Sequence, residues 1–303
     1  NFGNQLALMT HCQRGDEVIL GDDCHIVWHE TGGAAVLAGV QLRTIASDRG
    51  VLPPGEIEAR IRKGEDIHWP RTGLICLENA HSNGRVIPLD IMADTAAVAR
   101  RWQVPSNYDA AARIYTGVWD GTFQLAYSNN PAWVFFDIVG NDRYGLGRRI
   151  PAGWLDKWAL YQIGQYCDEL VPNGRGGTES RFVCNAYLQQ RADAYRVLQD
   201  LASVFRGMAY WASGAAVAVA DMPRDPVYTY TAANVVDGRF TYTGAGLRTR
   251  YTVALVSWND PSDMGRAKIE VVEDRDGIAR YGLRQIEVTA FACSSQGQAQ
   301  RMG

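Results

Sequence analysis

The sequence predicts a two-part chain, with an α/β part over residues 1–105 and a strand-rich α+β part over residues 106–303. The first observation is a break in composition, since all five histidines lie in the first part and all 14 tyrosines lie in the second. The second is that strand and helix patterns alternate before the break, which favours a parallel sheet. The third is that strand patterns dominate the last quarter of the chain. Because a single core gives no reason to sort residue types in this way, we place a domain boundary after residue 105.

Composition excludes several classes of protein. The net charge of −3 argues against a general nucleic-acid or membrane-surface binder, which needs a basic face. No apolar run approaches the ~20 residues that span a bilayer, so we expect no membrane-spanning segment. The six scattered cysteines contain no CxxC pair, which favours reduced thiols over a disulfide framework or zinc site. The start at Asn1 lacks an initiator Met and a signal-peptide layout, so we expect a segment of a longer protein.

Strands and helices alternate in the first part. Pro53-Pro54-Gly55-Glu56 is expected to open a helix, because proline is tolerated in a first turn and acidic side chains favour a helix N-terminus. The apolar run Gly73 to Leu77 predicts a buried strand. The remaining predicted elements are helices over residues 2–12 and 89–102, and strands over residues 17–20 and 40–45.

The second part mixes helices with many short strands. Tyr115 to Tyr127 predicts a β-hairpin, in which Asp120-Gly121 supplies the positive φ of a type I′ turn. Asn130-Pro131 predicts the N-cap and first residue of a helix over residues 132–139. We expect the tyrosines and tryptophans at core or subunit-interface positions. The other predictions are helices over 152–170 and 191–206, a Gly-rich loop over 171–180, and strands over 181–188, 208–211, 215–220, 228–230, 240–242, 251–258, 269–272 and 283–288.

Several patterns suggest chemistry, and each has a more ordinary interpretation. His25, His29 and Glu30 have a spacing that could bring them together on a helix, but no third metal ligand is identifiable. Asp168-Glu169 could suggest acid catalysis, although adjacent helix residues do not face each other and a solvated helix end explains them better. The glycine-rich stretches at 141–147 and 174–177 lack the strand-then-helix context and the lysine of a phosphate loop.

Five motifs of the first part follow one another in a specific order. They are His11–Glu17, Asp23–His25, Glu30–Leu37, Asp66–His68 and Leu77–His81. Together they resemble the low-specificity L-threonine aldolases, which are fold-type-I pyridoxal-phosphate enzymes, over nearly all of residues 2–105. The resemblance implies a truncated α/β unit, the partial parallel sheet of an aminotransferase-like domain. It also implies that His25 would stack on the ring of pyridoxal phosphate (PLP) and that His68 would face the substrate.

The same resemblance implies that catalysis is lost. A pyridoxal enzyme needs a lysine for the Schiff base and an acid facing the pyridine nitrogen. The chain contains only Lys63, Lys157 and Lys268, and none stands in the family's Ser-Lys-Gly setting. Ser106-Asn107-Tyr108 stands where the family has an Asp-Gly-Ala-Arg strand, and the family's phosphate loop would precede Phe2. We therefore expect no catalytic residue, no bound PLP and no metal. A cytoplasmic PLP-dependent aldolase, cleaving L-threonine to glycine and acetaldehyde, is the alternative function.

A second set of motifs covers the second part. They are Tyr115–Gly121, Asn129–Trp133, Asn141–Gly147, Asp156–Tyr161, Val197–Trp211 and Val253–Met264. These motifs resemble the tail tip attachment protein J family (host specificity proteins) of lambda-like phages over about residues 106–303. The resemblance implies a structural, non-catalytic segment of a phage tail hub.

The phage resemblance also implies partners and a location. It implies a homotrimer that contacts other tail-tip proteins, including the tape measure, and no nucleic acid. The location would be the virion tail tip, assembled in the host cytoplasm, with the receptor-binding tip beyond Gly303. Two origins of the junction stay open: a natural fusion, and the joining of two unrelated genes.

Overall fold

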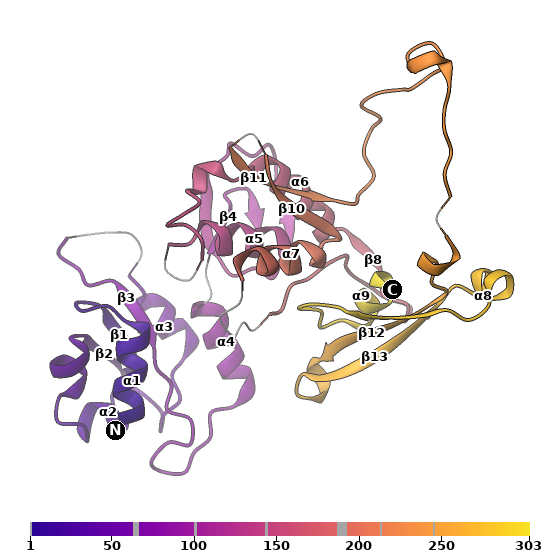
Figure 1. Ribbon diagram of the computed structural model, residues 1–303. Helices are drawn as coiled ribbons and strands as arrows, with labels where there is room; N and C mark the ends of the chain where they lie inside the picture. Colours follow the sequence, from indigo (N-terminus) through magenta and orange to yellow (C-terminus); the bar gives the residue numbers. More distant parts are fainter. Residues whose placement is uncertain are drawn as a thin grey trace. The chain divides into compact units, whose positions relative to one another are not determined.

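The chain divides into two compact units. The computed structural model describes residues 2–62, 67–99, 102–142, 145–186, 193–212, 214–244 and 246–303. Unit 1 is Asn1–Arg101 and unit 2 is Trp102–Gly303 (Figure 1). The division falls slightly before the predicted boundary at residue 105, because Trp102–Pro105 pairs as a strand with Phe123–Ala126 of unit 2.

Unit 1 is built around a parallel sheet. Strand β1 lies at its centre, in the order β2-β1-β3, and it pairs in parallel with both neighbours, as the alternation of strands and helices predicts. The described elements, in chain order, are α1 (Phe2–His11), β1 (Glu17–Gly21), α2 (His25–Trp28), the π-helix η1 (Ala34–Ala38), β2 (Gln41–Ile45), α3 (Pro54–Arg60), β3 (Thr72–Ile75) and α4 (Leu89–Ala99).

The central strand separates two small cores. All five residues of β1 are buried, and side chains alternate between the faces of a strand. Val18 and Leu20 therefore pack into one cluster with Leu8 of α1, whereas Ile19 packs into the other with Ile57 of α3.

The buried charge of Glu17 in β1 is fully partnered. Its carboxylate accepts hydrogen bonds from Arg43 at 3.0 Å, Arg62 at 2.8 Å and Thr72 at 2.7 Å. Burial alone would raise the pKa of Glu17, but these hydrogen bonds outweigh it and lower that pKa below the ordinary value. A charged residue is thus tolerated in the central strand.

Two predictions for unit 1 are wrong in detail. The run beginning at Gly73 forms β3, but its residues are only half-buried, because β3 is an edge strand with a neighbour on one side only. The last helix ends at Ala99, and Trp102 belongs to a strand of unit 2.

Unit 2 combines three main helices with small sheets, in which most but not all strand pairs are antiparallel. Its described elements are β4 (Trp102–Pro105), β5 (Tyr108–Asp109), β6 (Ile114–Tyr115), β7 (Phe123–Ala126), α5 (Pro131–Gly140), the 3-10 helix η2 (Ala152–Trp154), α6 (Lys157–Asp168), β8 (Leu170–Pro172), β9 (Thr178–Ser180), α7 (Ala194–Val204), β10 (Gly207–Ala212), β11 (Ala215–Ala220), the 3-10 helices η3 (Val236–Gly238) and η4 (Leu247–Thr249), β12 (Val253–Asp260), the 3-10 helix η5 (Pro261–Asp263), β13 (Arg266–Glu273), α8 (Arg275–Tyr281), β14 (Gln285–Thr289) and α9 (Gln296–Met302).

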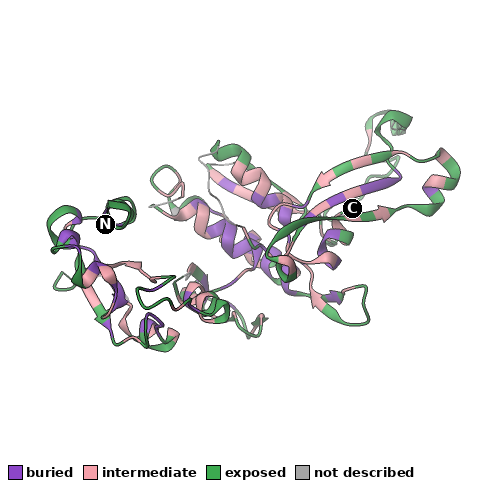
Figure 2. Ribbon diagram, turned by 90° about the horizontal axis from the view of Figure 1, so that it is seen from below, coloured by how far each residue is buried: buried purple, intermediate pink, exposed green. Residues whose placement is uncertain are grey.

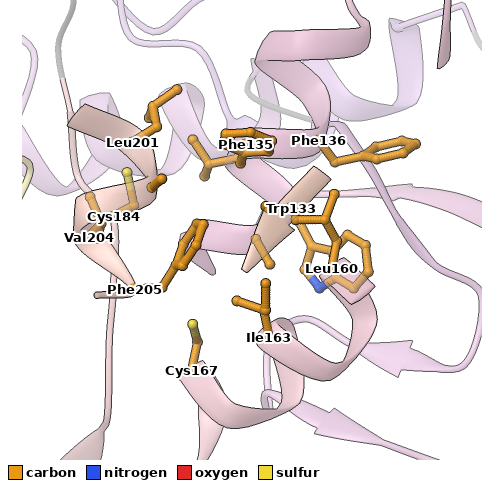
Figure 3. Packing of buried hydrophobic residues seen from close by; sticks show 14 of the residues in the cluster. Trp133, Phe135, Phe136, Leu160, Ile163, Cys167, Cys184, Leu201, Val204 and Phe205 are labelled. Carbon is orange, nitrogen blue, oxygen red and sulfur yellow. The ribbon is translucent and has the colours of Figure 1, made fainter. Parts of the chain in front are cut away.

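The main core of unit 2 lies between α5, α6 and α7. Figure 3 shows Trp133 and Phe135 of α5, Ile163 and Cys167 of α6, and Phe205 after α7 pointing into one cluster. Helix α5 is apolar on nearly every side, so most of its residues are buried. The structure joins none of the six cysteines in a disulfide.

A second, smaller core supports the C-terminal sheet. Its order is β13-β12-β14, and α9 packs against one face through Ala299 and Met302, which belong to one hydrophobic cluster with Val256 and Trp258 of β12. The burial pattern follows this arrangement, since β12 is mostly buried and β13 is mostly exposed (Figure 2).

The sequence predicted elements of unit 2 correctly where they depend only on residues close together in the chain. The Asn130 side chain accepts a hydrogen bond from the Ala132 backbone N–H, and Pro131 is the first residue of α5, as predicted. Strands β10 and β11 overlap the predicted strands 208–211 and 215–220, and they pair as an antiparallel hairpin. Strands β12, β13 and β14 overlap the predicted strands 251–258, 269–272 and 283–288.

The predicted hairpin at Tyr115 to Tyr127 is wrong. Strand β6 pairs with β5, and β7 pairs with β4, so the two segments have different partners. Only Gly121 of the Asp120-Gly121 pair has a positive φ, whereas a type I′ turn needs two. The Asp120 carboxylate instead accepts hydrogen bonds from Thr122.

Other predictions for unit 2 are wrong because tertiary contacts override local pattern. Helix α6 begins only after the N-cap Asp156, and the predicted loop after it is a β8–β9 hairpin. The described residues 181–186 form no strand, and neither do 228–230 or 240–242. The last two segments have strand-like sequences but pair with no strand among the residues that the structure describes.

Candidate functional site

The carboxyl end of β1 holds the predicted cofactor-stacking residue. His25 begins α2 shortly after β1 ends at Gly21, and ligands of parallel α/β sheets bind at this edge. The His25 ring nitrogen Nδ1 lies 3.3 Å from Glu30 Oε1, and the backbone N–H of His25 donates to Glu78 at 2.6 Å. Because the His25 side chain is 40% exposed, its ring is accessible at this edge.

Glu30 anchors the arrangement around His25. Its side chain is buried and accepts hydrogen bonds from Asn4 and Gln5, each at 2.7 Å. Burial would raise the pKa of Glu30, but the hydrogen bonds from Gln5, Asn4 and His25 lower it below its ordinary value. Gln5 and Glu78 were not singled out from the sequence, although Glu78 lies inside one of the quoted motifs.

The remaining predicted residues of unit 1 do not complete a site. His68, the predicted substrate-side residue, lies in an exposed turn, and its role stays a prediction. His29 contacts His25, with ring centroids 5.1 Å apart. No group of three or more metal-binding side chains occurs in the part of the chain that the structure describes, so the metal interpretation of His25, His29 and Glu30 has no structural support.

The described lysines do not fit a Schiff base with pyridoxal phosphate. Lys268 Nζ lies 2.6 Å from Asp260 Oδ2, and this hydrogen bond raises the pKa of Lys268 above its ordinary value. A Schiff-base lysine needs the opposite shift, since only the unprotonated amine attacks. Lys157 belongs to unit 2, donates to the Gly121 carbonyl at 2.8 Å and lies 5.3 Å from the Trp158 ring centroid. Lys63 lies outside the described residues.

The groove beside α3 is lined by arginines that already have partners. Arg43 and Arg62 bind Glu17, and Arg60 binds Glu56 at 2.5 Å. These side chains stabilise unit 1, and their charges are neutralised locally.

Asp168 of unit 2 is buried, which corrects the prediction of a solvated helix end. Its carboxylate forms an ion pair with Arg113 and accepts a hydrogen bond from Asn130 Nδ2 at 2.7 Å. Burial raises the pKa of Asp168 above its ordinary value, and the nearby Arg113 charge opposes that shift. Glu169 points to the surface and pairs with Arg181 at 2.6 Å. The adjacent acids therefore have separate structural partners.

The glycine-rich loop at 174–177 is the turn of the β8–β9 hairpin. The Asn173 side chain accepts hydrogen bonds from the backbone N–H groups of Arg175 and Gly177. These amides are thus already occupied, as expected for a loop that does not bind phosphate. The other glycine-rich stretch includes Arg143 and Tyr144, which lie outside the described residues.

A long exposed excursion joins β11 to β12. We call residues 222–244 and 246–251 the arm, the orange excursion of Figure 1. Tyr228, Tyr230, Phe240 and Tyr242 are 46–89% exposed. The three tyrosines therefore do not lie in the core of this chain, and the alternative position at a subunit interface stays a prediction. Among the described residues, every helix is too short or too polar to span a bilayer.

Sequence comparison finds that the two parts are similar to different classes of protein. Residues 1–128 match the family described as "Beta-eliminating lyase", and residues 193–303 match the family described as "Putative phage tail protein". The chain thus combines a part similar to lyases with a part similar to phage tail proteins.

Individual relatives show both similarities in more detail. Tip attachment protein J of Escherichia phage SECphi27 is 41% identical over 238 residues, which is 78% of this chain and 20% of the relative. The protein of the same name from Escherichia phage SECphi4 is 35% identical over 282 residues, 93% of this chain and 23% of the relative. Low specificity L-threonine aldolase of Escherichia coli (strain K12) is 40% identical over 116 residues, 38% of this chain and 34% of the relative.

These matches confirm both predicted resemblances. The chain spans about a fifth to a quarter of the length of the phage relatives it matches. The aldolase similarity covers a smaller part of the chain than the phage similarity. Both phage matches cover more than the roughly two thirds of the chain that follows residue 105, so they extend into the lyase-like part.

Proposed function

We propose that this chain is a structural segment of a phage tail tip and has no catalytic activity. The observation that carries the proposal is the 41% identity to a tip attachment protein J over 78% of the chain. The proposed location is the virion tail tip, assembled in the host cytoplasm. The proposed partners are further copies of the chain, as a homotrimer, and other tail-tip proteins including the tape measure.

The geometry of unit 2 supports a structural role. Its buried polar side chains serve packing, since Asp168 and Asn130 connect α6 to the start of α5. Its largest buried side chains, including Trp133 and Phe135, form one core. The exposed aromatic residues of the arm provide a surface for assembly with other subunits.

A domain exchange tests the tail-tip role. Residues 102–303 would replace the matching region of tip attachment protein J in Escherichia phage SECphi27. We expect the hybrid phage to assemble tails and form plaques, whereas the same hybrid with Trp133→Ala should fail because its core is disrupted. A hybrid protein that accumulates in soluble form yet enters no tail would overturn the proposal.

We further propose that unit 1 binds no pyridoxal phosphate as an internal aldimine. The motivating observation is that Lys268 is paired with Asp260, and Lys157 with the Gly121 carbonyl. Treatment of the native chain with pyridoxal phosphate and borohydride, followed by peptide mass spectrometry, should label these lysines and Lys63 no more than in urea-denatured chain. Specific labelling of one lysine, together with cleavage of L-threonine to glycine, would favour the aldolase alternative.

A further inference from the structure

The turn between β8 and β9 holds one of the two Asn-Gly pairs of the sequence. Asn173-Gly174 lies in this turn, and Asn83-Gly84 lies in an exposed turn of unit 1. In such a pair the backbone nitrogen of glycine can attack the side-chain Cγ of asparagine, because glycine has no side chain to hinder the approach. Arginine follows both pairs, so only their surroundings in the fold distinguish them.

The attacking nitrogen has a different setting in each pair. The Gly84 N–H donates a hydrogen bond to the His81 carbonyl at 2.6 Å. The Gly174 N–H donates none to the residues that the structure describes. A hydrogen-bonded N–H must give up its acceptor before its nitrogen can react. The native fold therefore protects Asn83-Gly84 and leaves Asn173-Gly174 open to the reaction.

The side-chain carbonyl of Asn173 is also polarised. Its Oδ1 accepts hydrogen bonds from the backbone N–H groups of Arg175 at 2.8 Å and Gly177 at 3.1 Å. Negative charge develops on this oxygen when a nitrogen attacks Cγ, and two fixed N–H donors stabilise that charge as an oxyanion hole does. Asn83 Oδ1 accepts from one backbone N–H only, that of Arg85 at 2.9 Å. Both features thus favour reaction at Asn173.

We propose that Asn173 is a site of spontaneous deamidation through a cyclic imide closed by the Gly174 nitrogen. The Gly174 nitrogen bonds to Asn173 Cγ, and the Cγ–Nδ2 bond breaks. The proton of the Gly174 N–H passes through water to the departing nitrogen, which leaves as ammonia. Water then adds to either carbonyl of the ring and returns a proton to the Gly174 nitrogen, which gives aspartate or isoaspartate. Each product adds a negative charge to the turn.

The modified turn lies against α9. A Cβ on Gly297 of α9 would lie 3.0 Å from the Asn173 carbonyl oxygen, and a Cβ on Gly174 would lie 3.2 Å from Gln300 Oε1. Aspartate keeps the course of the backbone, whereas isoaspartate inserts a methylene group into the backbone at this contact. The modification therefore acts on the packing between the β8–β9 hairpin and the C-terminal helix.

Incubation of the full chain at mildly alkaline pH, native and in urea, tests the site. Peptide mass spectrometry over time measures aspartate and isoaspartate at both Asn-Gly pairs. We expect the native chain to deamidate Asn173 at least about tenfold faster than Asn83, because only Asn173 combines an open nitrogen with two donors to Oδ1. In urea, where both settings are lost and each pair is followed by arginine, we expect the two rates to be equal.

Two variants complete the experiment, and circular dichroism checks that each is folded. Asn173→Gln has a longer side chain that closes the ring much more slowly, so it should lose most of the product that the native wild-type chain forms. Asn83→Gln, the matched control, should form product at Asn173 as fast as the wild type. Equal rates at the two pairs of the native chain, or a faster rate at Asn83, would overturn the inference. A preference for Asn173 that persists in urea would also overturn it, since the fold would then not be its cause.

Discussion

Asn130 connects two helices of unit 2, and its replacement should destabilise the unit strongly. The side chain is fully buried. Its Oδ1 accepts from the Ala132 backbone N–H at 3.0 Å, and its Nδ2 donates to the Gly164 carbonyl at 2.8 Å and to Asp168 Oδ2 at 2.7 Å. Asn130→Ala removes all three hydrogen bonds and leaves the Asp168 carboxylate with one donor fewer.

The magnitude follows from these three contacts. An N-cap contributes about 1 kcal/mol, a buried neutral hydrogen bond about 1 kcal/mol, and a hydrogen bond to a charged group about 1.5–3 kcal/mol. We therefore expect Asn130→Ala to lower the free energy of unfolding by about 4 kcal/mol. Asn130→Ser keeps a capping oxygen but cannot reach Asp168. It should therefore lower the free energy of unfolding by about 1 kcal/mol less than Asn130→Ala does.

Urea unfolding of the full chain measures the effect. The near-ultraviolet circular dichroism of the chain reports mainly on unit 2, which holds all 14 tyrosines and the cluster around Trp133 and Tyr115, whose side chains are hydrogen-bonded at 2.9 Å. With a slope of about 2 kcal/mol per M urea, the midpoint for Asn130→Ala should fall by about 2 M. Asn259→Ala, which removes an exposed hydrogen bond to Gly265, is the matched control and should change the free energy of unfolding by less than about 0.5 kcal/mol.

Two outcomes would refute this reasoning. If Asn130→Ala lowers the free energy of unfolding by less than about 1 kcal/mol, water replaces the buried hydrogen bonds without cost. Equal losses for the Ala and Ser variants would mean that the cap contributes nothing, and that the contacts to Gly164 and Asp168 account for the whole effect.

Two further predictions concern the space beside a glycine and the pH dependence of stability. Gly207→Ala should lower the free energy of unfolding by about 2 kcal/mol, because a Cβ there would collide with the Val219 carbonyl. Gly153→Ala, where a Cβ meets open space, is the thermal-unfolding control and should change little. Lys268 lowers the pKa of Asp260 to about 2, so this pair stabilises the fold above the ordinary Asp pKa and loses that effect as pH falls from about 4 to 2. The difference in melting temperature between wild type and Asp260→Asn should therefore shrink over that interval, and a constant difference would contradict the assignment.

The candidate site was only partly predictable from sequence. Motif order placed His25 and Glu30 in one region, and the structure brings the two side chains within 3.3 Å. The burial of Asp168 was missed because its partner Arg113 lies far away in sequence. Two adjacent acids at a helix end look solvated unless the opposing cation is known. The exposure of Tyr228 and Tyr242 was missed for a related reason, since strand-like sequence says nothing about whether a partner strand is present.

The sequence by itself determined the two resemblances, the parallel order of unit 1 and the cap of α5. These features depend on motif order or on contacts between near neighbours, as with Asn130 and Ala132. Only the tertiary structure decided that β7 pairs with β4, that Asp168 is buried and that the arm leaves Phe240 exposed. Each of these depends on which distant segments meet, and hydrophobic burial and hydrogen bonding between distant segments are not encoded in any local pattern.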